Sequence, residues 1–353
     1  MTLTKLPKIS PSHMYGLARR SVKENSHLST YDKFKTLYLT KLEKNLIQRL
    51  QEIKPINIGW FVFIFLFAFP YILLRLYYAI YSLTPEQILG FPRDLTDVIF
   101  FIIVFPLIAY LLRKHDRFTK IYKETVIEPI IKFINPNLQY FPNKHISAKD
   151  YLDSRLFKMD KTFEGDDYIE GVLDNFEFKM SELHTAYESK HPIFDGLFFV
   201  FKYQKNINSK TCIYPDRAQR LIGKLLAQKI QSFLGSRDNE NLVKLENPEF
   251  EKLFKVFSTD QIEARTILTP VMMEKIIKFQ NDLGAVKLYI SFINNSVYIG
   301  LKSATHKQFF EPPSLIPRSK IAIFNFAQDI YNCINTPIEI AKEINNNASV
   351  WKK

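Results

Sequence analysis

Gly59-Trp-Phe-Val-Phe-Ile-Phe-Leu-Phe-Ala-Phe-Pro-Tyr-Ile-Leu-Leu74 decides the predicted fold, because these sixteen consecutive residues carry no charge. The apolar pattern resumes after Arg75, so that 23 residues run from Gly59 to Tyr81. At about 1.5 Å per residue, a helix of this length exceeds the roughly 30 Å of a bilayer's hydrocarbon core. Arg75 would snorkel towards the headgroups or face a neighbouring helix. The sequence therefore predicts a transmembrane helix over residues 58–81.

A second apolar run, Val98 to Leu112, has fifteen residues, a length that fits either a buried core helix or a membrane span. It contains no charged residue, and the cluster Arg113-Lys114-His115-Asp116-Arg117 closes it. These features favour a second transmembrane helix over residues 97–113, with residues 82–96 as a short external connector. A re-entrant hairpin and a hydrophobic hairpin buried in a soluble protein are the alternatives.

The net charge of +12 is concentrated beside the apolar runs. Residues 1–57 carry a net +7 and residues 113–150 a net +4, whereas residues 82–97 carry −2 and residues 151–353 carry +2. By the positive-inside rule, this distribution predicts an inner-membrane protein with both termini in the cytoplasm. A protein that neutralises phosphates would carry its charge on its folded domain, so we expect no nucleic-acid partner.

Basic residues next to the apolar runs are candidate contacts for anionic lipids, and the lipid bilayer is therefore an expected partner. These candidates are Lys54, Arg113, Lys114 and Arg117, with Lys41, Lys44 and Lys120 on the adjoining segments.

The rest of the chain divides around the predicted hairpin. Residues 1–32 form a polar N-terminal tail. Residues 33–57 form an amphipathic juxtamembrane helix, because apolar residues recur there at intervals of three and four. Residues 114–139 form a second juxtamembrane helix that could pack against the first. Residues 140–353 form a cytoplasmic α+β domain.

Strand and helix patterns alternate within residues 140–353. The expected strands cover residues 168–173, 176–186, 196–203, 242–245 and 254–257, and a hairpin joins residues 287–292 to 297–301. One expected helix runs from Asp216 to Gly235, and another runs from Thr269 to Gly284. A last helix covers residues 321–344, with Pro337 as a candidate break. The predicted fold class is therefore α+β: an N-terminal two-helix transmembrane hairpin followed by a soluble cytoplasmic domain with an antiparallel sheet and several helices.

No stretch carries a catalytic signature, and we predict no catalytic residue, no cofactor and no metal ligand. The nearest candidate is Asp160 to Gly171, where oxygen ligands precede a glycine as in a calcium loop. Its eighth position is Asp167 instead of an apolar residue, and its last position is glycine instead of glutamate. A solvated acidic turn is the better interpretation. Cys212 and Cys333 are too few for a disulfide framework.

Two motifs stand out in the C-terminal region. They are Phe194-Asp195-Gly196-Leu197-Phe198 and the run Glu246, Phe250, Phe254, Asp260, Ala264 and Arg265, which Ile267-Leu-Thr-Pro270 continues. With these residues the chain resembles, over residues 58–313, a family of uncharacterised bacterial two-span membrane proteins known as a domain of unknown function. The resemblance implies the bacterial inner membrane and supports the two-span prediction, but it supplies no activity and no site residue.

The leading functional hypothesis is a membrane-anchored, non-enzymatic binding or scaffolding protein that presents its α+β domain to a protein partner at the cytoplasmic face. It rests on a nearly neutral domain without recognisable chemistry. The alternatives are an enzyme acting at the membrane surface with acids near Asp160–Asp174, and a lipid-sensing module. A pocket with converging carboxylates or histidines of perturbed pKa would favour the enzyme.

Overall fold

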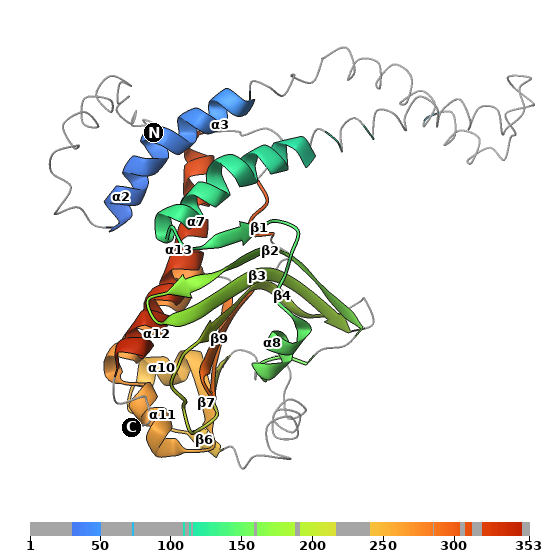
Figure 1. Cartoon of the computed structure of the whole chain (residues 1–353). Coiled ribbons are helices and arrows are strands. Elements are labelled where there is room, and N and C mark those ends of the chain that lie inside the picture. The colour runs from blue at the N-terminus through green and yellow to red at the C-terminus, as the bar shows by residue number, and fades with distance from the viewer. Residues whose placement is uncertain are drawn as a thin grey trace, which may run out of the picture. The chain divides into compact units, whose positions relative to one another are not determined.

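The structure, a computed structural model, describes residues 30–50, 73, 109, 113, 116–158, 161–187, 191–216, 241–284, 286–303, 308–312 and 320–347 (Figure 1). The chain divides into two compact units. The first comprises residues 1–126 with 312–318, and the second comprises residues 127–311 with 319–353.

The transmembrane part of the predicted fold class is corrected by the structure. No helix in the described part of the chain is both long and apolar enough to cross a membrane. The helix α13, Lys320–Asn346, has 27 residues, but it carries charges such as Asp329 and Glu339. The prediction rested on the length of the apolar runs and on the charges that flank them, and residues 58–81 and 97–113 lie outside the described residues apart from 73, 109 and 113.

Two helical segments make up the described core of the first unit. Residues 30–50 form α2 (Thr30–Leu37), the π-helix η2 (Tyr38–Leu42) and α3 (Glu43–Leu50), while residues 116–122 are also helical and continue into η3 (Lys123–Ile127). Arg49 Nη2 donates to Glu124 Oε2 at 3.0 Å, so the two segments lie side by side.

A regular step of four residues builds the buried face of the first segment. Phe34, Tyr38, Leu42 and Leu46 are all at most 2% exposed. Four residues overshoot one α-helical turn of about 3.6 residues, so a stripe with this spacing drifts around an α-helix. The wider turn of η2 takes up the excess and keeps the four side chains in line.

The second unit is built on one nine-stranded sheet with the strand order β1-β2-β3-β4-β9-β8-β5-β7-β6 (Figure 1). Every neighbouring pair is antiparallel. The strands are β1 (Gln139–Phe141), β2 (Thr162–Leu173), β3 (Phe176–Tyr187), β4 (His191–Lys202), β5 (Thr211–Pro215), β6 (Asn241–Val243), β7 (Phe254–Ser258), β8 (Lys287–Ile293) and β9 (Ser296–Lys302).

Helices cover both faces of this sheet (Figure 1). On one face lies α8 (Ala148–Asp153), whose Tyr151 hydroxyl lies 3.0 Å from the Thr185 hydroxyl above a cluster that includes Phe194 and Phe198. On the other face lie α12 (Pro270–Leu283) and α13, where the Tyr203 hydroxyl donates to the Ala341 carbonyl at 3.0 Å. The shorter helices are α7 (Glu128–Ile134), α10 (Pro248–Leu253) and α11 (Gln261–Ile267).

Local sequence signals explain several of these elements, and the corresponding predictions are confirmed. Thr269 accepts the Met272 N–H at 3.2 Å and starts α12, while Gly284 ends it with a φ of 61°. The β8–β9 hairpin turns at Asn294, whose φ of 56° suits asparagine. The predicted break at Pro337 is wrong, since α13 continues through it.

Other elements differ from the prediction. The three expected strands over residues 168–203 are present as parts of β2, β3 and β4, but β2 begins earlier, at Thr162. The expected β6 and β7 are present, whereas β5 and the short helices α8, α10 and α11 were not anticipated. The expected helix after Asp216 lies outside the described residues.

The Asp195-Gly196 step marks a close approach between β4 and β9. Gly196 has a φ of 151°, and a Cβ atom at this position would lie 1.9 Å from the Leu301 carbonyl oxygen. The Ser303 N–H donates to the Asp195 carbonyl at 2.8 Å beside it. A side chain at residue 196 would therefore force the two strands apart.

Replacing Gly196 by alanine should lower the unfolding free energy more than the same replacement at a glycine that has a positive φ but no close neighbours. Gly284 provides that control, because its φ is also positive but nothing lies within 4 Å of its added Cβ. We expect Gly284→Ala to lower the unfolding free energy by about 1–2 kcal/mol. Gly196→Ala should lose at least twice as much in urea unfolding. Equal losses would show that the approach of β4 to β9 is not tight.

Candidate functional site

Three carboxylates converge where β2 meets β3, and we call Asp166, Asp167 and Glu182 the carboxylate cluster. Their ligand oxygens all lie within 4.8 Å of one another. Asp166 and Glu182 are direct partners across the two strands, and the strand register shifts between Asp166 and Ile169. This bulge gives Asp167 a φ of 53° and lets two consecutive aspartates approach one glutamate.

Glu182 is the most strongly perturbed member of the cluster. Its residue is 8% exposed, and the Phe309 N–H donates to both carboxylate oxygens at 3.0 Å. Burial, with smaller contributions from Asp166 and Asp167, raises the pKa of Glu182 to about 8, although the backbone N–H groups oppose this shift. Burial among two further carboxylates therefore disfavours the charged form of Glu182.

Asp167 is held in place by β1 and the loop that follows it. The Tyr140 hydroxyl donates to Asp167 Oδ1, and the Asp167 N–H donates to the Pro142 carbonyl at 3.0 Å. Burial, followed by the nearby Asp167 carboxylate, raises the pKa of the Tyr140 hydroxyl. The tyrosine therefore stays protonated and acts as a fixed hydrogen-bond donor to the cluster.

A short segment, residues 308–311, covers the cluster, and we call it the strap. Phe309 is 4% exposed and Phe310 is fully buried. The Phe310 ring stacks on the Tyr140 ring with centroids 6.5 Å apart. The strap thus contacts Glu182 through its backbone and Tyr140 through an aromatic ring.

The chemistry of this arrangement follows from the crowding of three carboxylates. Three carboxylates at this spacing can relieve their repulsion by holding a proton or by binding a cation. The oxygens of Glu182 face the Phe309 N–H and Asp167 faces the Tyr140 hydroxyl, whereas a hard cation takes about six or more oxygen ligands. These hydrogen bonds occupy part of the cluster's ligand set, and no described contact supplies the remaining ligands that such a cation takes.

The structure corrects the interpretation of residues 160–171 as a solvated acidic turn. Most of this stretch belongs to β2, and Asp167 is 1% exposed. Converging carboxylates with a perturbed pKa, the feature that would favour an enzyme, are therefore present. They lie under the strap, however, and the described pocket is elsewhere.

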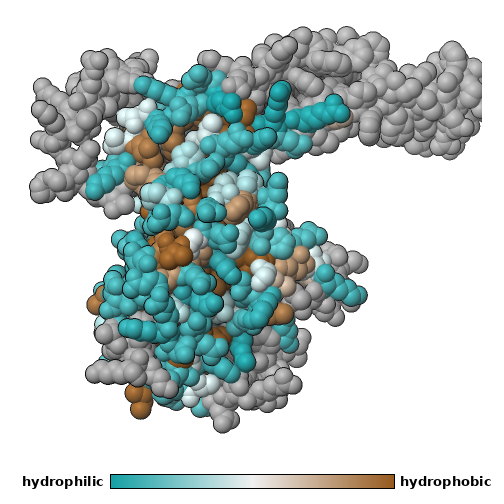
Figure 2. Space-filling model, in the orientation of Figure 1, coloured by the Kyte–Doolittle hydropathy of each residue, from teal (hydrophilic) through white to brown (hydrophobic). Residues whose placement is uncertain are grey.

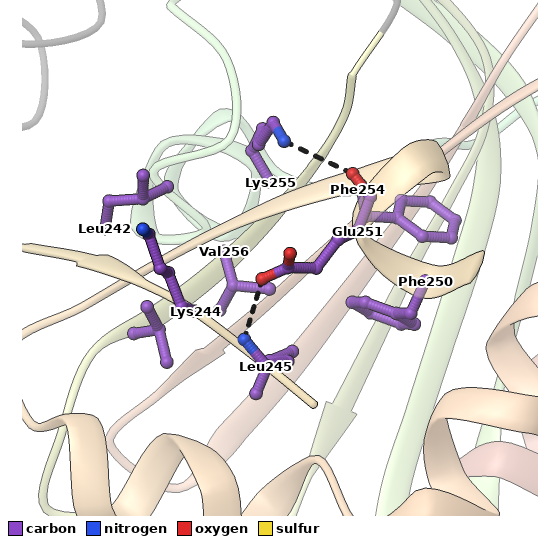
Figure 3. Close-up of a pocket in the computed structure, with 9 residues that line it drawn as sticks. Leu242, Lys244, Leu245, Phe250, Glu251, Phe254, Lys255 and Val256 are labelled. Atoms are coloured by element: carbon purple, nitrogen blue, oxygen red, sulfur yellow. Dashed lines mark hydrogen bonds between the residues drawn. The ribbon is translucent and has the colours of Figure 1, made fainter. Parts of the chain in front are cut away.

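That pocket lies between β6, α10 and β7 (Figure 3). Its volume of about 70 Å³ suits a couple of water molecules rather than an organic substrate. Hydrogen bonds across it tie neighbouring segments together: the Leu245 N–H donates to Glu251 Oε1 at 2.8 Å, and Lys255 Nζ donates to the Glu251 carbonyl at 3.2 Å. The pocket is lined by Leu242, Val243, Lys244, Leu245, Phe250, Glu251, Phe254, Lys255 and Val256.

Two of the four candidate lipid contacts lie within the described residues. Arg113 and Arg117 are exposed and four residues apart in helical segments. Lys54 and Lys114 lie outside the described residues. The sequence did not single out Glu182, Tyr140 or the strap; the one available signal was a glutamate among the apolar residues of a strand.

The motif Glu246 to Arg265 proves to organise local structure. Asn247 and Asp260 accept backbone N–H groups and cap α10 and α11. Glu263 accepts the N–H groups of Asn208 at 3.0 Å and Ser209 at 2.5 Å, which holds the loop before β5. These residues shape the local structure of the second unit.

Comparison with known proteins identifies a domain but no activity. Residues 192–346 match a family model described as a protein of unknown function (DUF3137). No curated protein matches the chain. A solved structure, the mycobacterial trehalose monomycolate transport factor A, TtfA, is similar at 9% identity with a TM-score of 0.30, covering 61% of this chain and 93% of that one. A TM-score this low establishes neither a shared fold nor a shared function.

Protonation of Glu182 should make stability fall as pH rises. Because folding raises its pKa from 4.5 to about 8, the native state binds the proton more tightly between these values. The unfolding free energy should therefore decrease from near pH 4.5 to pH 8, by up to about 4 kcal/mol. Glu182→Gln should flatten this dependence in denaturant titrations at several pH values, and an unchanged slope would contradict the assignment.

Proposed function

We propose that this chain is a non-enzymatic binding or scaffolding protein associated with the inner membrane, where it presents its sheet domain to a protein partner at the cytoplasmic face. The observation that carries the proposal is the division of the first unit's described helices into a buried apolar face and an exposed basic surface. A nucleic-acid partner is not proposed. The match to a domain of unknown function is compatible with this role and assigns no other.

The basic surface flanks the stripe of Phe34, Tyr38, Leu42 and Leu46. Figure 2 shows hydrophilic residues over much of the described helices of this unit. The exposed cations are Lys33, Lys35, Lys41, Lys44, Arg49, Arg113, Arg117 and Lys120. Arg49 pairs with Glu124, and the remaining cations outnumber the exposed acids of these segments.

Such a surface suits an anionic membrane. Each lysine or arginine near an anionic leaflet contributes about 1 kcal/mol of attraction, which salt screens over roughly 8–10 Å. Several cations therefore supply a useful affinity without any lipid-specific pocket. This reasoning supports lipid contact by the helices and leaves the sheet domain available to a partner.

An enzyme at the membrane surface is the second candidate. It is favoured by one feature, the raised pKa of Glu182 beside two aspartates, since paired carboxylates with different pKa values are typical of general acid–base catalysis. The strap opposes it, because the Phe309 N–H occupies both oxygens of Glu182. We therefore prefer the binding role.

Removing two exposed arginines should weaken binding to anionic vesicles. We expect the double variant Arg113→Gln, Arg117→Gln to bind phosphatidylglycerol-containing vesicles with about 2 kcal/mol less affinity, roughly a 30-fold loss. Flotation of the full chain with anionic and with neutral phosphatidylcholine vesicles measures this effect. The difference between the two vesicle types should shrink at high salt.

The matched control is the double variant Lys252→Gln, Lys278→Gln, which removes two exposed charges from the second unit. It should bind both vesicle types like the unaltered chain. If both double variants lost affinity equally, net charge would explain binding, and the proposed role of the first unit's helices would fail.

A further inference from the structure

We propose that Lys287 and Lys302, two paired lysines on the sheet of the second unit, together bind a phosphate group. The ligand class is a phosphate monoester, either a soluble one or the headgroup of a phospholipid. The proposal goes beyond the proposed function and does not depend on it, because both lysines lie outside the first unit. It rests on strand register, on the face that the two side chains share and on their partners.

Strand register places the two lysines opposite each other. Lys287 on β8 and Lys302 on β9 are direct partners in the antiparallel ladder, at the end of the hairpin away from its turn. The Cβ atoms of such partners lie about 4.5–5.5 Å apart on the same face of a sheet. Like charges at directly opposite positions destabilise a ladder, so this pair favours the binding of an anion.

Both lysines lie on the face of the sheet that contacts Phe157. Tyr289, two residues after Lys287, packs on Phe157 with ring centroids 4.8 Å apart. Gly300, two residues before Lys302, faces the same ring, since an added Cβ would lie 3.0 Å from it. Side chains alternate between the two faces along a strand, so the lysines point to this aromatic side. Apolar neighbours lower the local dielectric constant and strengthen the attraction of an ammonium group for an anion.

The known partners of the two ammonium groups leave donors for a ligand. In the described part of the chain, neither Lys287 nor Lys302 forms an ion pair with a carboxylate. Lys302 Nζ donates to the Ile193 carbonyl at 2.6 Å, which uses one of the three donors of an ammonium group. The remaining donors of Lys302 and those of Lys287 can bind the oxygens of an anion.

The electrostatic surroundings agree with this geometry. Burial, followed by the charge of Lys287, lowers the pKa of Lys302, and the charge of Asp195 only partly opposes the shift. A bound anion would offset the repulsion between the two lysines and raise the pKa of Lys302 again.

A phosphate monoester matches the pair better than a carboxylate does. Near neutral pH it carries close to two negative charges, against the single charge of a carboxylate, and two ammonium groups face it. Lysine binds phosphate as a point charge, so the pair needs no fork-shaped geometry. The hydrogen bond to Ile193 already orients Lys302, which reduces the entropy lost on binding.

Reductive methylation of the full chain, followed by mass spectrometry of its peptides, tests whether a phosphate group occupies the pair. At saturation the ligand should slow methylation of Lys302 by about fivefold or more, relative to chloride at equal ionic strength. The internal control is Lys252, an exposed lysine on α10, whose methylation should not change.

Two probes distinguish the sources of the phosphate group. Glycerol phosphate represents a soluble ester, and vesicles of phosphatidic acid in phosphatidylcholine represent a lipid headgroup, with vesicles of phosphatidylcholine alone as their reference. Protection of Lys302 by either probe supports the proposal and identifies the source. Protection by neither probe, or equal protection of Lys252, overturns it.

Two variants show whether the lysines act as a pair. Lys287→Gln removes one of the two cations and should abolish the protection of Lys302, whichever probe supplies it. Lys278→Gln removes an exposed charge from α12 and should keep the protection. If Lys302 stays protected in Lys287→Gln, the paired site is wrong. Should Lys287→Gln fail to fold, Lys302→Gln gives the same test, read as the protection of Lys287.

Discussion

The second unit depends on one constraint: the central strands of its sheet are apolar on both faces, and neither face can meet water. On β4, Phe194 and Phe198 point to the face covered by α8, whereas Phe199 and Phe201 point to the face covered by α13. Helices on both sides are the direct consequence. The same constraint explains the raised pKa of Glu182, which occupies a position in β3 that its neighbours fill with apolar side chains such as Met180.

Features encoded within a few residues could be predicted from the sequence. Thr269-Pro270 and Gly284 delimit α12 because capping and positive φ are local requirements. The elements that were missed are short. The helices α10 and α11 have six and seven residues, too few to show a helical period, and all five residues of β5 are buried, so it lacks the alternation of a half-exposed strand. The transmembrane prediction is corrected because no helix in the described part of the chain is both long and apolar enough to cross a membrane; apolar length and flanking charge by themselves do not reveal tertiary contacts.

The carboxylate cluster could not be predicted, because its members are brought together by pairing rather than by sequence spacing. Adjacent aspartates are common in solvated turns, and nothing in residues 160–171 indicates the bulge that buries Asp167. Glu182 meets Asp166 through strand register and meets Phe309 through the return of a distant segment. What the sequence did offer was one ionisable residue inside a strand, and such residues are best treated as candidate sites until their surroundings are known.

The matched residues 192–346 have an unexpected relation to the sheet. They include the strands β4, β9, β8, β5, β7 and β6, but they leave out β1, β2 and β3. The boundary of the match therefore falls along the ladder between β3 and β4 rather than in a linker. A polypeptide trimmed to the matched residues would keep β4 except His191 and would leave it as an open edge without its partner β3. Long apolar edges recruit strands from other molecules. In the full chain β3 pairs with β4 along its length, so the N-terminal strands cover an edge that the matched residues by themselves would leave open.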